Sequence, residues 1–512
     1  MRTPIRALGL GALVVLSLVP MQGCTDLSET PASAITPENF YRTEAEVLGG
    51  LAAVYAQLRS MLDDPWWVAE VSSDEMVIPT RGSDWYDNGQ WLELQRQTWT
   101  VSSPGHINGA WNVAFTGIVR ANVLLNALQN VTVPNQGTIV AELRTLRGFY
   151  YYVLMDMFGG VPIVTDIEIK ARPRATRTEV FQFIESELND ARTALPDRWP
   201  DASNGRLTKG AADAILASMY LNAGVFMKDV GVSATSYNTC LGVQVSGGVD
   251  ACQAAIDAAD RIINSGQYSL AAVWRSNFTY DNQFSPENIM VVKFLPANDL
   301  GLNFVMRTLH YNQFTPSPWN GFATLAAAYN AFDANDQRRQ VFLVGPQVNV
   351  ETGLPVNDRS GQPLVFTTTI NDVTAATESE GARIYKWPVD PNHVAQNNGN
   401  DVAIFRLAEI YLIKAEAQFE MGNAAGLLLL NQLRARVFNP PQPLAAIDRA
   451  ALLGERLFEL TAEGKRRQDL IRHGRYTAPW EFKLQGAPNL ILMPIPQPQL
   501  DANPLLVQNP GY

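Results

Sequence analysis

Two polar loops carry the side chains best suited to binding a ligand. The first, at 81–89, places the rings of Trp85 and Tyr86 next to the carboxylate of Asp87 in a segment rich in Gly, Asn and Asp. Segments of this composition usually lie at the surface. An exposed ring stacks on the C–H face of a sugar, while Asp and Asn side chains bond the sugar hydroxyls. Trp85, Tyr86 and Asp87 are therefore predicted to contact a ligand.

The second loop, at 311–321, repeats this composition and contains Trp319 and Asn320. The same reasoning makes both residues candidate ligand contacts. Packing is the alternative for Trp319, because it follows Pro318 and Pro–Trp pairs often lie against a core. The sequence leaves these two interpretations of the second loop open.

Five of the eleven tryptophans fall between Pro65 and Trp99, in a stretch without helical period that we expect to be irregular. Large rings either fill a core or present a flat apolar face to a ligand. For four tryptophans in and near this stretch we expect core packing between loops and helices. These four are Trp66, Trp67, Trp99 and Trp111.

Recognised motifs for catalysis, metal binding or cofactor binding are missing from the sequence. It contains no HExxH, CxxC or GxSxG pattern and no glycine pattern for phosphates or dinucleotides. The four histidines are too widely spaced for a local metal motif; they are His106, His310, His393 and His473. A glycosidase pair of carboxylates stays open, because only their separation in space identifies it. We predict a binding protein with no catalytic residues, no cofactor and no metal.

The composition favours a large folded body and narrows the choice of partner. Of the 512 residues, 46% are hydrophobic and 17% are charged, so the chain can bury an extensive core. Its formal net charge of -11 repels the phosphates of nucleic acid and anionic lipid. Nucleic acid is therefore not expected as a partner, whereas neutral and cationic ligands stay open.

The first residues have the pattern of an export signal. Two arginines precede an apolar run at 7–19, which is too short to span a bilayer. Gly23 and Cys24 follow, and this ending is similar to a bacterial lipobox with Met21 in place of the usual Leu. We predict a lipoprotein signal peptide at 1–23 and a lipid anchor on Cys24. The alternative is an ordinary signal peptide that is cut elsewhere.

Two further cysteines, Cys240 and Cys252, are a candidate disulfide. An exported compartment permits them to pair. They lie in and just after a stretch rich in Gly, Ser and Val, so a bond would fasten a local loop. Because they lack CxxC spacing, we expect a structural role rather than redox chemistry.

Helical periodicity dominates two parts of the chain. Thr43 and Glu46 form a capping box before the first helix, whose apolar face holds Val47, Leu51, Val54 and Leu58. Further helices are predicted at about 107–125, 143–157, 178–195, 208–223, 252–265, 321–332, 403–420, 424–436 and 447–463. Short Gly-Asn turns between such helices suggest tetratricopeptide-like pairs, in which each hairpin buries its apolar face on the next.

These patterns predict a mainly α protein, and a chain of 512 residues allows one to three domains. Tetratricopeptide-like helix pairs form a scaffold at about 40–265 and 401–470. The segment at about 267–400 is rich in loops and irregular, with a strand-like run at 289–294. Charged residues at helical spacing near the C-terminus are expected to form ion pairs that fix helix register; they are Glu409, Glu416, Arg434, Arg436, Glu455, Arg456, Glu459, Glu463 and Asp469.

Several blocks of sequence together resemble the SusD/RagB family of surface-exposed nutrient-binding lipoproteins, and the resemblance covers nearly the whole chain. The most recognisable block reads Arg-Thr-Leu-Arg-Gly-Phe-Tyr-Tyr-Tyr at 144–152 and continues as Asp-Met-Phe-Gly-Gly-Val-Pro at 156–162. The other similar blocks are the opening at 35–41, the paired helices at 406–417 and 455–466, and the ending at 492–512.

Membership in this family implies both a fold and a role. The fold would be a single domain over 24–512. Its helical scaffold of tetratricopeptide-like pairs would lie at about 40–265 and 401–470, and an irregular half at about 267–400 would hold the ligand. The role would be to cap a SusC-like TonB-dependent transporter at the outer membrane, anchored by lipid and facing the cell exterior. There it would capture glycan or peptide and release it into the transporter.

Three other functions compete with glycan capture. Peptide capture uses the same architecture with another ligand. A periplasmic tetratricopeptide scaffold would bind proteins alone through a helix-lined groove. A glycoside hydrolase on a helical scaffold would release reducing ends from the glycan that it binds.

Overall fold

The computed structural model describes residues 40–103, 105–229 and 231–512. Residues 41–512 form one compact unit. Cys24 and the predicted signal peptide lie outside the described residues, and so does most of the opening block at 35–41.

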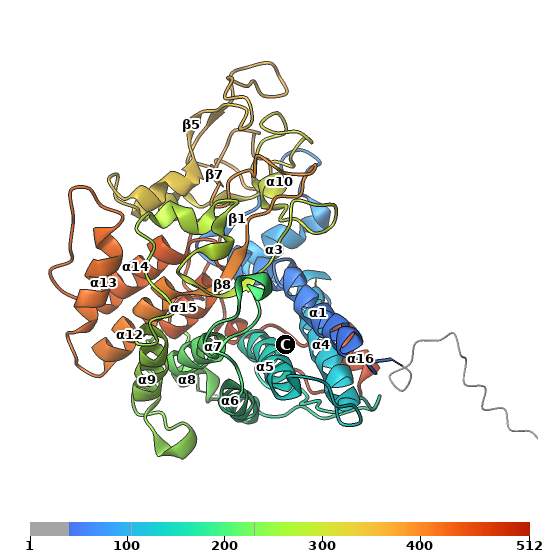
Figure 1. The fold of residues 1–512 in the computed structure, drawn as a ribbon. Coiled ribbons are helices and arrows are strands. Elements are labelled where there is room, and N and C mark those ends of the chain that lie inside the picture. The colour runs from blue at the N-terminus through green and yellow to red at the C-terminus, as the bar shows by residue number, and fades with distance from the viewer. Residues whose placement is uncertain (1–39, 104, 230) are drawn as a thin grey trace, which may run out of the picture. The chain divides into compact units, whose positions relative to one another are not determined.

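Long helices pack in succession and build the scaffold (Figure 1). They are α1 (Glu44–Ser60), α4 (Gly105–Ala127), α5 (Gln136–Phe158), α6 (Arg177–Arg192), α7 (Lys209–Leu221), α9 (Ala251–Ile263), α12 (Leu407–Glu420), α13 (Gly426–Ala435) and α14 (Arg449–Leu460). Helix α5 packs on α4 and α6, α9 packs on α7 and α12, and α12 also packs on α13. The protein is therefore mainly α with tetratricopeptide-like helix pairs, as predicted.

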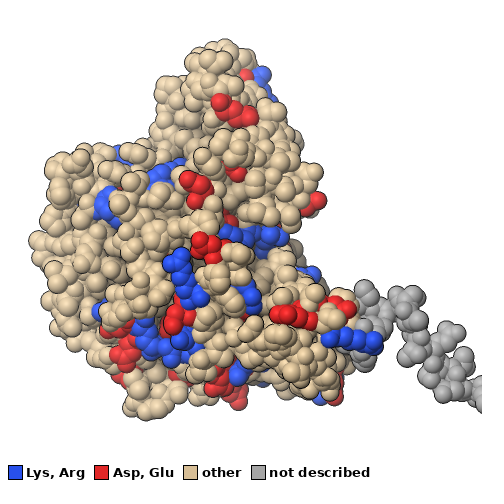
Figure 2. Space-filling view, viewed as in Figure 1, with Lys and Arg blue, Asp and Glu red and all other residues tan. Residues whose placement is uncertain are grey.

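Shorter helices separate or follow the long ones along the chain. They are α2 (Asp64–Val71), α3 (Gln90–Arg96), α8 (Ala223–Phe226), α10 (Phe304–Thr308), α11 (Ala326–Ala331), α15 (Arg466–Arg472) and α16 (Gln497–Ala502). In Figure 1 the loop-rich segment lies above the helix pairs, beside α3 and α10. On the face drawn in Figure 2 this upper region is mostly uncharged, whereas acidic and basic residues mix over the helices.

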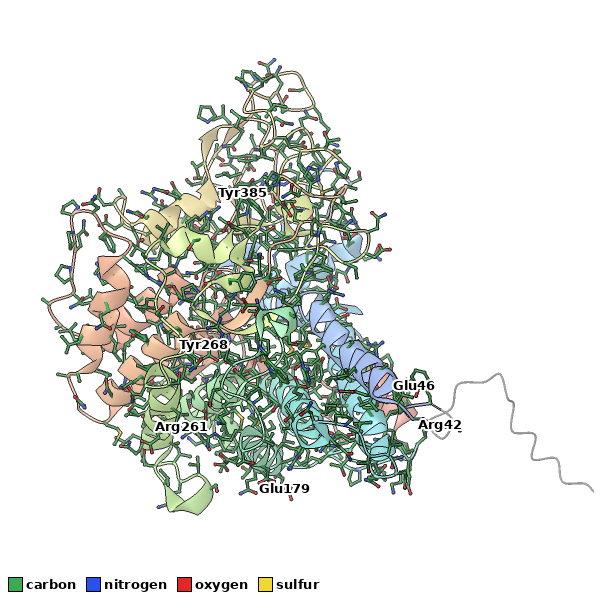
Figure 3. The ribbon with its side chains drawn as sticks, in the orientation of Figure 1. Arg42, Glu46, Glu179, Arg261, Tyr268 and Tyr385 are labelled. Atoms are coloured by element: carbon green, nitrogen blue, oxygen red, sulfur yellow. A yellow bond between two sulfur atoms is a disulfide. The ribbon has the colours of Figure 1, made fainter. Side chains whose placement is uncertain are left out.

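Capping residues and stop residues in the sequence lie at helix ends in the structure. Thr43 and Glu46 close the predicted capping box of α1, and Thr176 and Glu179 close an equivalent one at α6. Figure 3 labels Glu46 and Glu179 at these two helix starts. Helix α5 stops at Gly159, whose φ of 74° is open to glycine at little steric cost.

Three expectations about elements are wrong. Residues expected to begin a helix at 403 instead form strand β8 (Val402–Arg406), which pairs antiparallel with β2 (Asn288–Val292) before α12 begins. The helix expected at 321–332 is shortened to α11. The Trp-rich stretch expected to be irregular contains α2, where Pro65 takes a first-turn position that needs no backbone N–H donor.

A small antiparallel sheet joins segments that are far apart in sequence. Its strands are β1 (Met76–Val77), β3 (Ala323–Thr324), β4 (Phe342–Leu343) and β7 (Ala382–Ile384), in the order β1-β3-β7-β4. A separate hairpin pairs β5 (Gly345–Pro346) with β6 (Val365–Phe366). Because β1 shortly precedes the loop at 81–89 and β3 directly follows the loop at 311–321, their pairing brings the two predicted ligand loops to one place.

The recognisable block at 144–162 is part of the core. Tyr150, Tyr151 and Phe158 of α5 are fully buried. The hydroxyl of Tyr150 donates a hydrogen bond to the carbonyl of Val54 on α1, at 2.9 Å. Gly117 of α4 lies against the Tyr150 ring, and a Cβ at Gly117 would come within 2.4 Å of it. This block therefore fixes how α1, α4 and α5 pack.

Cys240 and Cys252 form a disulfide, with their Cα atoms 5.0 Å apart. The bond ties the segment before α9 to the first turn of that helix. Asp250 caps the same turn by accepting a hydrogen bond from the backbone N–H of Cys252 at 2.9 Å. The disulfide thus has the local structural position that the sequence indicated.

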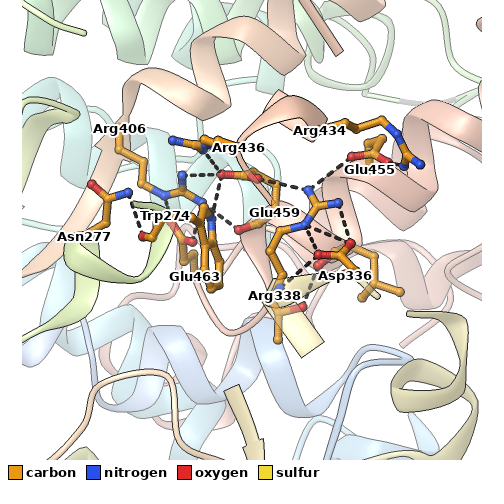
Figure 4. Close-up of polar contacts among 12 residues, drawn as sticks. Trp274, Asn277, Asp336, Arg338, Arg406, Arg434, Arg436, Glu455, Glu459 and Glu463 are labelled. Carbon is orange, nitrogen blue, oxygen red and sulfur yellow. Dashed lines mark hydrogen bonds and ion pairs between the residues drawn. The ribbon is translucent and has the colours of Figure 1, made fainter. Parts of the chain in front are cut away.

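The predicted ion pairs form a buried network, and they involve two arginines that the sequence analysis did not single out (Figure 4). Arg338 binds Asp336 at 2.7 Å and Glu459 at 3.0 Å, and Arg406 binds Glu459 and Glu463, each at 2.7 Å. All of these side chains are nearly or fully inaccessible to solvent. The network joins the loop-rich segment to α14.

Candidate functional site

The two predicted loops touch each other through Trp85. Its indole N–H donates to the carbonyl oxygen of Trp319 at 2.6 Å. Its ring lies 5.7 Å from that of Trp91 and 5.5 Å from that of Phe322. The ring also lies flush on Gly321, where a Cβ would approach it to 2.3 Å. Trp85 is therefore half-buried and connects the loops, with part of its surface left exposed.

Tyr86 and Asp87 are the exposed members of the first loop. The side chain of Tyr86 is 57% exposed, although its neighbour Trp85 is half-buried. Asp87 faces solvent, and one of its oxygens accepts a hydrogen bond from the indole N–H of Trp91 at 2.7 Å. The first loop thus presents an aromatic ring and a positioned carboxylate next to each other at the surface.

Trp319 and Asn320 have different positions in the second loop. Trp319 is half-buried, and its ring centre is 5.8 Å from the guanidinium carbon of Arg307. Asn320 is fully buried. Its amide N–H donates to the carbonyl of Glu378 at 3.0 Å, and its amide oxygen accepts from Arg383 at 2.8 Å. Asn320 therefore holds the loop in place, and a ligand contact by its side chain does not fit this geometry.

Two buried arginines hold the backbone under the site. Arg81 donates to the carbonyls of Asn320 at 2.9 Å and Glu380 at 2.7 Å. Arg383 donates to the carbonyls of Glu380 and Glu378, each at 2.7 Å. Burial lowers the pKa of Arg81 to about 10 and lowers that of Arg383 well below its ordinary value. Both arginines act as rigid backbone braces.

A chain of polar contacts, which sequence reasoning missed, ties three loops together at the surface. The hydroxyl of Tyr311 donates to Asp84 at 2.5 Å, and the guanidinium of Arg359 stacks on the Tyr311 ring at 3.9 Å. Arg359 also pairs with Glu378, which contacts His310 at 2.9 Å. Burial, together with the hydrogen bond to Asp84, raises the pKa of Tyr311 to about 12. Tyr311 stays a neutral donor at ordinary pH.

The charges around the two loops do not add up to a basic surface. Arg359 is half-exposed, and Asp84, Asp87 and Glu378 surround the same site. Arg81 and Arg383 lie beneath and are occupied by backbone carbonyls. An anionic ligand would meet more acidic than basic groups at the surface, so the arrangement disfavours an anionic ligand.

The four tryptophans that were expected to pack in the core do so. Trp66, Trp99 and Trp111 are buried in the core, and Trp67 is half-buried against it. The indole N–H of Trp66 donates to the carbonyl of Ala462 at 3.2 Å. These rings belong to the support of the site rather than to its exposed face.

Metal binding and membrane crossing have no matching feature among the described residues. Among residues 40–103, 105–229 and 231–512, no group of three or more His, Cys, Asp or Glu side chains could hold a metal ion. Within the same ranges, no helix has both the length and the apolar character that crossing a membrane requires.

Two family models match the chain over complementary regions. The model described as "SusD family" matches residues 265–512, and the model described as "Starch-binding associating with outer membrane" matches residues 43–221. Together they cover the whole loop-rich segment and both parts of the helical scaffold apart from residues 222–264, which include α9.

Curated relatives match over most of their own length. The chain is 24% identical to SusD-like protein P25 of Formosa agariphila, over 95% of this chain and 96% of the relative. It is 25% identical to Starch-binding protein SusD of Bacteroides thetaiotaomicron, over 84% of this chain and 82% of the relative.

Solved structures share the fold. A structure titled "Laminarin binding SusD-like protein" has a TM-score of 0.73 and 24% identity, and it covers 92% of this chain and 100% of its own. Surface glycan-binding protein A from Bacteroides thetaiotaomicron, solved in complex with laminarihexaose, has a TM-score of 0.70 and 19% identity, with coverage of 91% and 99%.

Proposed function

Because the chain belongs to the SusD family, we propose that it captures a glycan at the cell surface and delivers it to a SusC-like TonB-dependent transporter. The observation that carries the proposal is the pair of joined loops, where Tyr86 is exposed beside the half-buried rings of Trp85 and Trp319. Rings stack on the C–H faces of sugars, and the carboxylate of Asp87 accepts hydrogen bonds from their hydroxyls.

A neutral oligosaccharide or polysaccharide is the ligand class that this surface suits best. The relatives named for starch and laminarin bind neutral glucans, and the site of this chain has acidic groups around its rings. Peptide capture is the second candidate. It would use the same rings, but the exposed carboxylates would favour peptides with basic side chains.

The test compares two exposed tyrosines. Tyr86→Ala should weaken binding of the recognised glycan by roughly threefold to tenfold, because a stacking ring is lost from the surface. Tyr280→Ala is the matched control, since Tyr280 is 39% exposed and lies outside the two loops. Binding is measured by calorimetric titration of the mature chain against laminarin, starch, other plant and microbial glycans, and peptides.

Each competing function has its own outcome in the same set of measurements. Equal glycan affinities in wild type and Tyr86→Ala would overturn the loop site. Binding of peptides alone would redirect the proposal to peptide capture. Release of reducing ends from a bound glycan would identify a hydrolase.

We place the protein on the outer face of the outer membrane, held by acyl chains on Cys24. Protease added to whole cells should digest a surface lipoprotein and spare a periplasmic scaffold. Cys24→Ala should abolish detergent-phase partitioning of the protein, because the acylated thiol is lost. Persistence of wild-type partitioning in this variant would contradict lipid anchoring at Cys24.

A further inference from the structure

The chain between β5 and β6 reaches the two candidate loops and carries Arg359 to them. One of its turns is closed by the carboxylate of Asp358, which accepts a hydrogen bond from the backbone N–H of Ser360 at 2.9 Å. The side-chain amide of Asn312, in the second loop, donates to the carbonyl of Asn357 at 2.8 Å. Arg359 therefore lies in a turn that is fastened to the second loop.

Three groups hold the guanidinium of Arg359 in one orientation. Its Nε donates to Glu378, and the guanidinium carbon lies over the Tyr311 ring, 3.9 Å from the ring centre. Its Nη2 is 3.5 Å from a carboxylate oxygen of Asp84, which directly precedes Trp85 in the first loop. A guanidinium that is already oriented loses little conformational freedom when it binds a ligand.

Glu378 is fixed as the ionised partner of Arg359. It accepts a second hydrogen bond from the backbone N–H of Arg359 at 3.0 Å, and Nε2 of His310 lies 2.9 Å from it. The backbone N–H of Asn312 donates to Nδ1 of His310 at 3.2 Å, so Nε2 carries the proton and donates to Glu378. Burial raises the pKa of Glu378, but the hydrogen bonds from Arg359 and His310 outweigh burial and lower it below its ordinary value.

The guanidinium of Arg359 keeps unpaired donors at an exposed position. The side chain is half-exposed, and its Nη1 has no hydrogen-bond acceptor in the described part of the chain. The N–H groups of a guanidinium form a planar fork that fits two neighbouring acceptor oxygens. Neighbouring hydroxyls of a sugar are such a pair. A ligand carboxylate would also meet Asp84 and Glu378 here, so hydroxyl oxygens are the better acceptors.

Arg359 complements the exposed groups of the first loop. Tyr86 presents an aromatic face, and the ionised carboxylate of Asp87 accepts hydrogen bonds without donating any. The two buried arginines beneath the loops, Arg81 and Arg383, are occupied by backbone carbonyls. With Arg359 the exposed surface combines an apolar ring, an acceptor and a donor, which together recognise a sugar.

We propose that Arg359 is a specificity-determining residue of the loop site, where its free N–H groups donate hydrogen bonds to neighbouring hydroxyl oxygens of a neutral glycan. The inference rests on the proposed glycan capture and deepens it. The chain between β5 and β6 becomes a third ligand-contacting element beside the two loops. Glycans that lack one of the recognised hydroxyls should bind less tightly, because a donor built into the site is then left without its partner.

The first measurement compares Arg359→Met with the wild type by calorimetric titration of the mature chain against laminarin and starch. Met keeps a linear apolar side chain for the contact with Tyr311 and removes every side-chain donor. Affinity for the glycan that the wild type binds should fall roughly tenfold, because hydrogen bonds from a charged donor are lost. Arg198→Met is the matched control and should keep wild-type affinity, since Arg198 is exposed, pairs with Asp201 at 3.5 Å and belongs to neither loop.

A second measurement separates ligand contact from support of the loops. Its probes are trisaccharides of the bound glycan, laminaritriose for laminarin and maltotriose for starch, together with forms in which a single hydroxyl is replaced by hydrogen. At least one deoxygenated form should bind the wild type roughly tenfold more weakly than its parent does. Arg359→Met should bind that form and its parent equally well. A residue that merely supports the loops would weaken the binding of every form by the same factor.

Two results would overturn the role of Arg359. They are equal glycan affinities in wild type and Arg359→Met, or the same proportional loss for each deoxygenated form in both proteins. Tyr86→Ala, titrated with the same glycan, reports separately on capture at the loops. Loss of affinity in Tyr86→Ala alone would leave glycan capture standing and remove Arg359 from the contact. Absence of glycan binding by the wild type would overturn glycan capture, and this inference with it.

Discussion

Adjacent residues in the first loop have different roles, although the sequence made them look equivalent. Trp85 connects the loops through its hydrogen bond to Trp319, whereas Tyr86 projects into solvent. Trp85 therefore contributes to the stability of the loops, whereas Tyr86 is exposed for contact with a ligand.

Trp85→Ala should lower both stability and glycan affinity. The half-buried ring loses its contacts with Trp91 and Phe322 together with one hydrogen bond, which costs about 2 kcal/mol of unfolding free energy. Thermal unfolding and titration of the same sample measure both effects. A melting temperature equal to that of wild type would show that the ring does not support the loops.

The composition of the loops indicated a candidate site, but not how each residue is placed in it. Aromatic residues stand out in Gly- and Asn-rich segments. For this reason the sequence indicated Trp85, Tyr86 and Trp319 as candidate ligand contacts. Asn320 was expected to face a ligand, yet it is buried with both ends of its amide bonded. Arg359 gave no local signal, because its partners Asp84 and Glu378 are 275 and 19 residues away in sequence.

At the scale of elements, a pair of buried carboxylates connects α2 and β1 to the chain that follows α14. Glu70 accepts a hydrogen bond from the backbone N–H of Gly464, and Glu75 accepts one from that of Ala462. Burial raises the pKa of Glu75 to about 7, against the opposing effect of Arg466 and Lys386. Burial and the neighbouring Glu75 also raise the pKa of Glu70.

These carboxylates should make the protein less stable as pH rises through neutrality. The folded state binds a proton on Glu75 more tightly than the unfolded state does, so its contribution is complete below about pH 4.5 and is lost as pH passes 7. The loss is about 3 kcal/mol, measured by denaturant unfolding between pH 5 and 8.

Glu75→Gln is the control for this pH dependence. The amide keeps an oxygen for Ala462 and does not ionise, so the contribution of Glu75 should disappear and stability should fall less between pH 5 and 8, with Glu70 responsible for what is left. Unchanged pH dependence in this variant would assign the effect to other groups.

Helices were predicted more reliably than the short strands, for a physical reason. A helix such as α6 carries its own capping box and apolar face within sixteen residues. Strand β8 depends on β2, more than a hundred residues earlier in the chain, and its apolar residues merge into those of α12 without a turn. Local sequence patterns therefore predict helix pairs, but they do not show which strands pair.

At the scale of the whole molecule, the buried ionic network holds the loop-rich segment on the helices. Glu459 receives hydrogen bonds from Arg338, Arg406 and Trp274, at 3.0, 2.7 and 2.9 Å. The arginines Arg436, Arg406 and Arg338 hold its pKa well below the ordinary range despite burial. Glu459 is therefore ionised throughout the physiological pH range.

Glu459→Gln should destabilise the whole unit by about 3–5 kcal/mol, because buried guanidinium groups lose part of their compensating charge. Denaturant unfolding measures this loss. Glu168→Gln, at an exposed pair with Lys170, is the control and should change stability by less than about 1 kcal/mol. Similar small changes in both variants would show that the network does not hold the fold.

The disulfide should act on the scaffold without acting on the ligand loops. Replacing Cys240 and Cys252 together by Ser removes a crosslink that closes a short loop, which costs about 3 kcal/mol of unfolding free energy. Glycan affinity should stay as in wild type, because the bond fastens the start of α9. A large fall in affinity at a temperature where the variant is folded would contradict this separation.

The network between Arg338, Arg406 and α14 also has a consequence for heat resistance. Taking charges out of water costs less free energy as temperature rises, because the hydration of ions carries a strongly negative entropy. The stabilising free energy of hydrophobic burial, per unit of buried area, increases little over the same temperature range. The junction between the loop-rich segment and the helices should therefore weaken less on warming than the purely apolar contacts between helices. Heating should then loosen the apolar helix pairs before it releases the loop-rich segment, which carries the second of the two candidate loops.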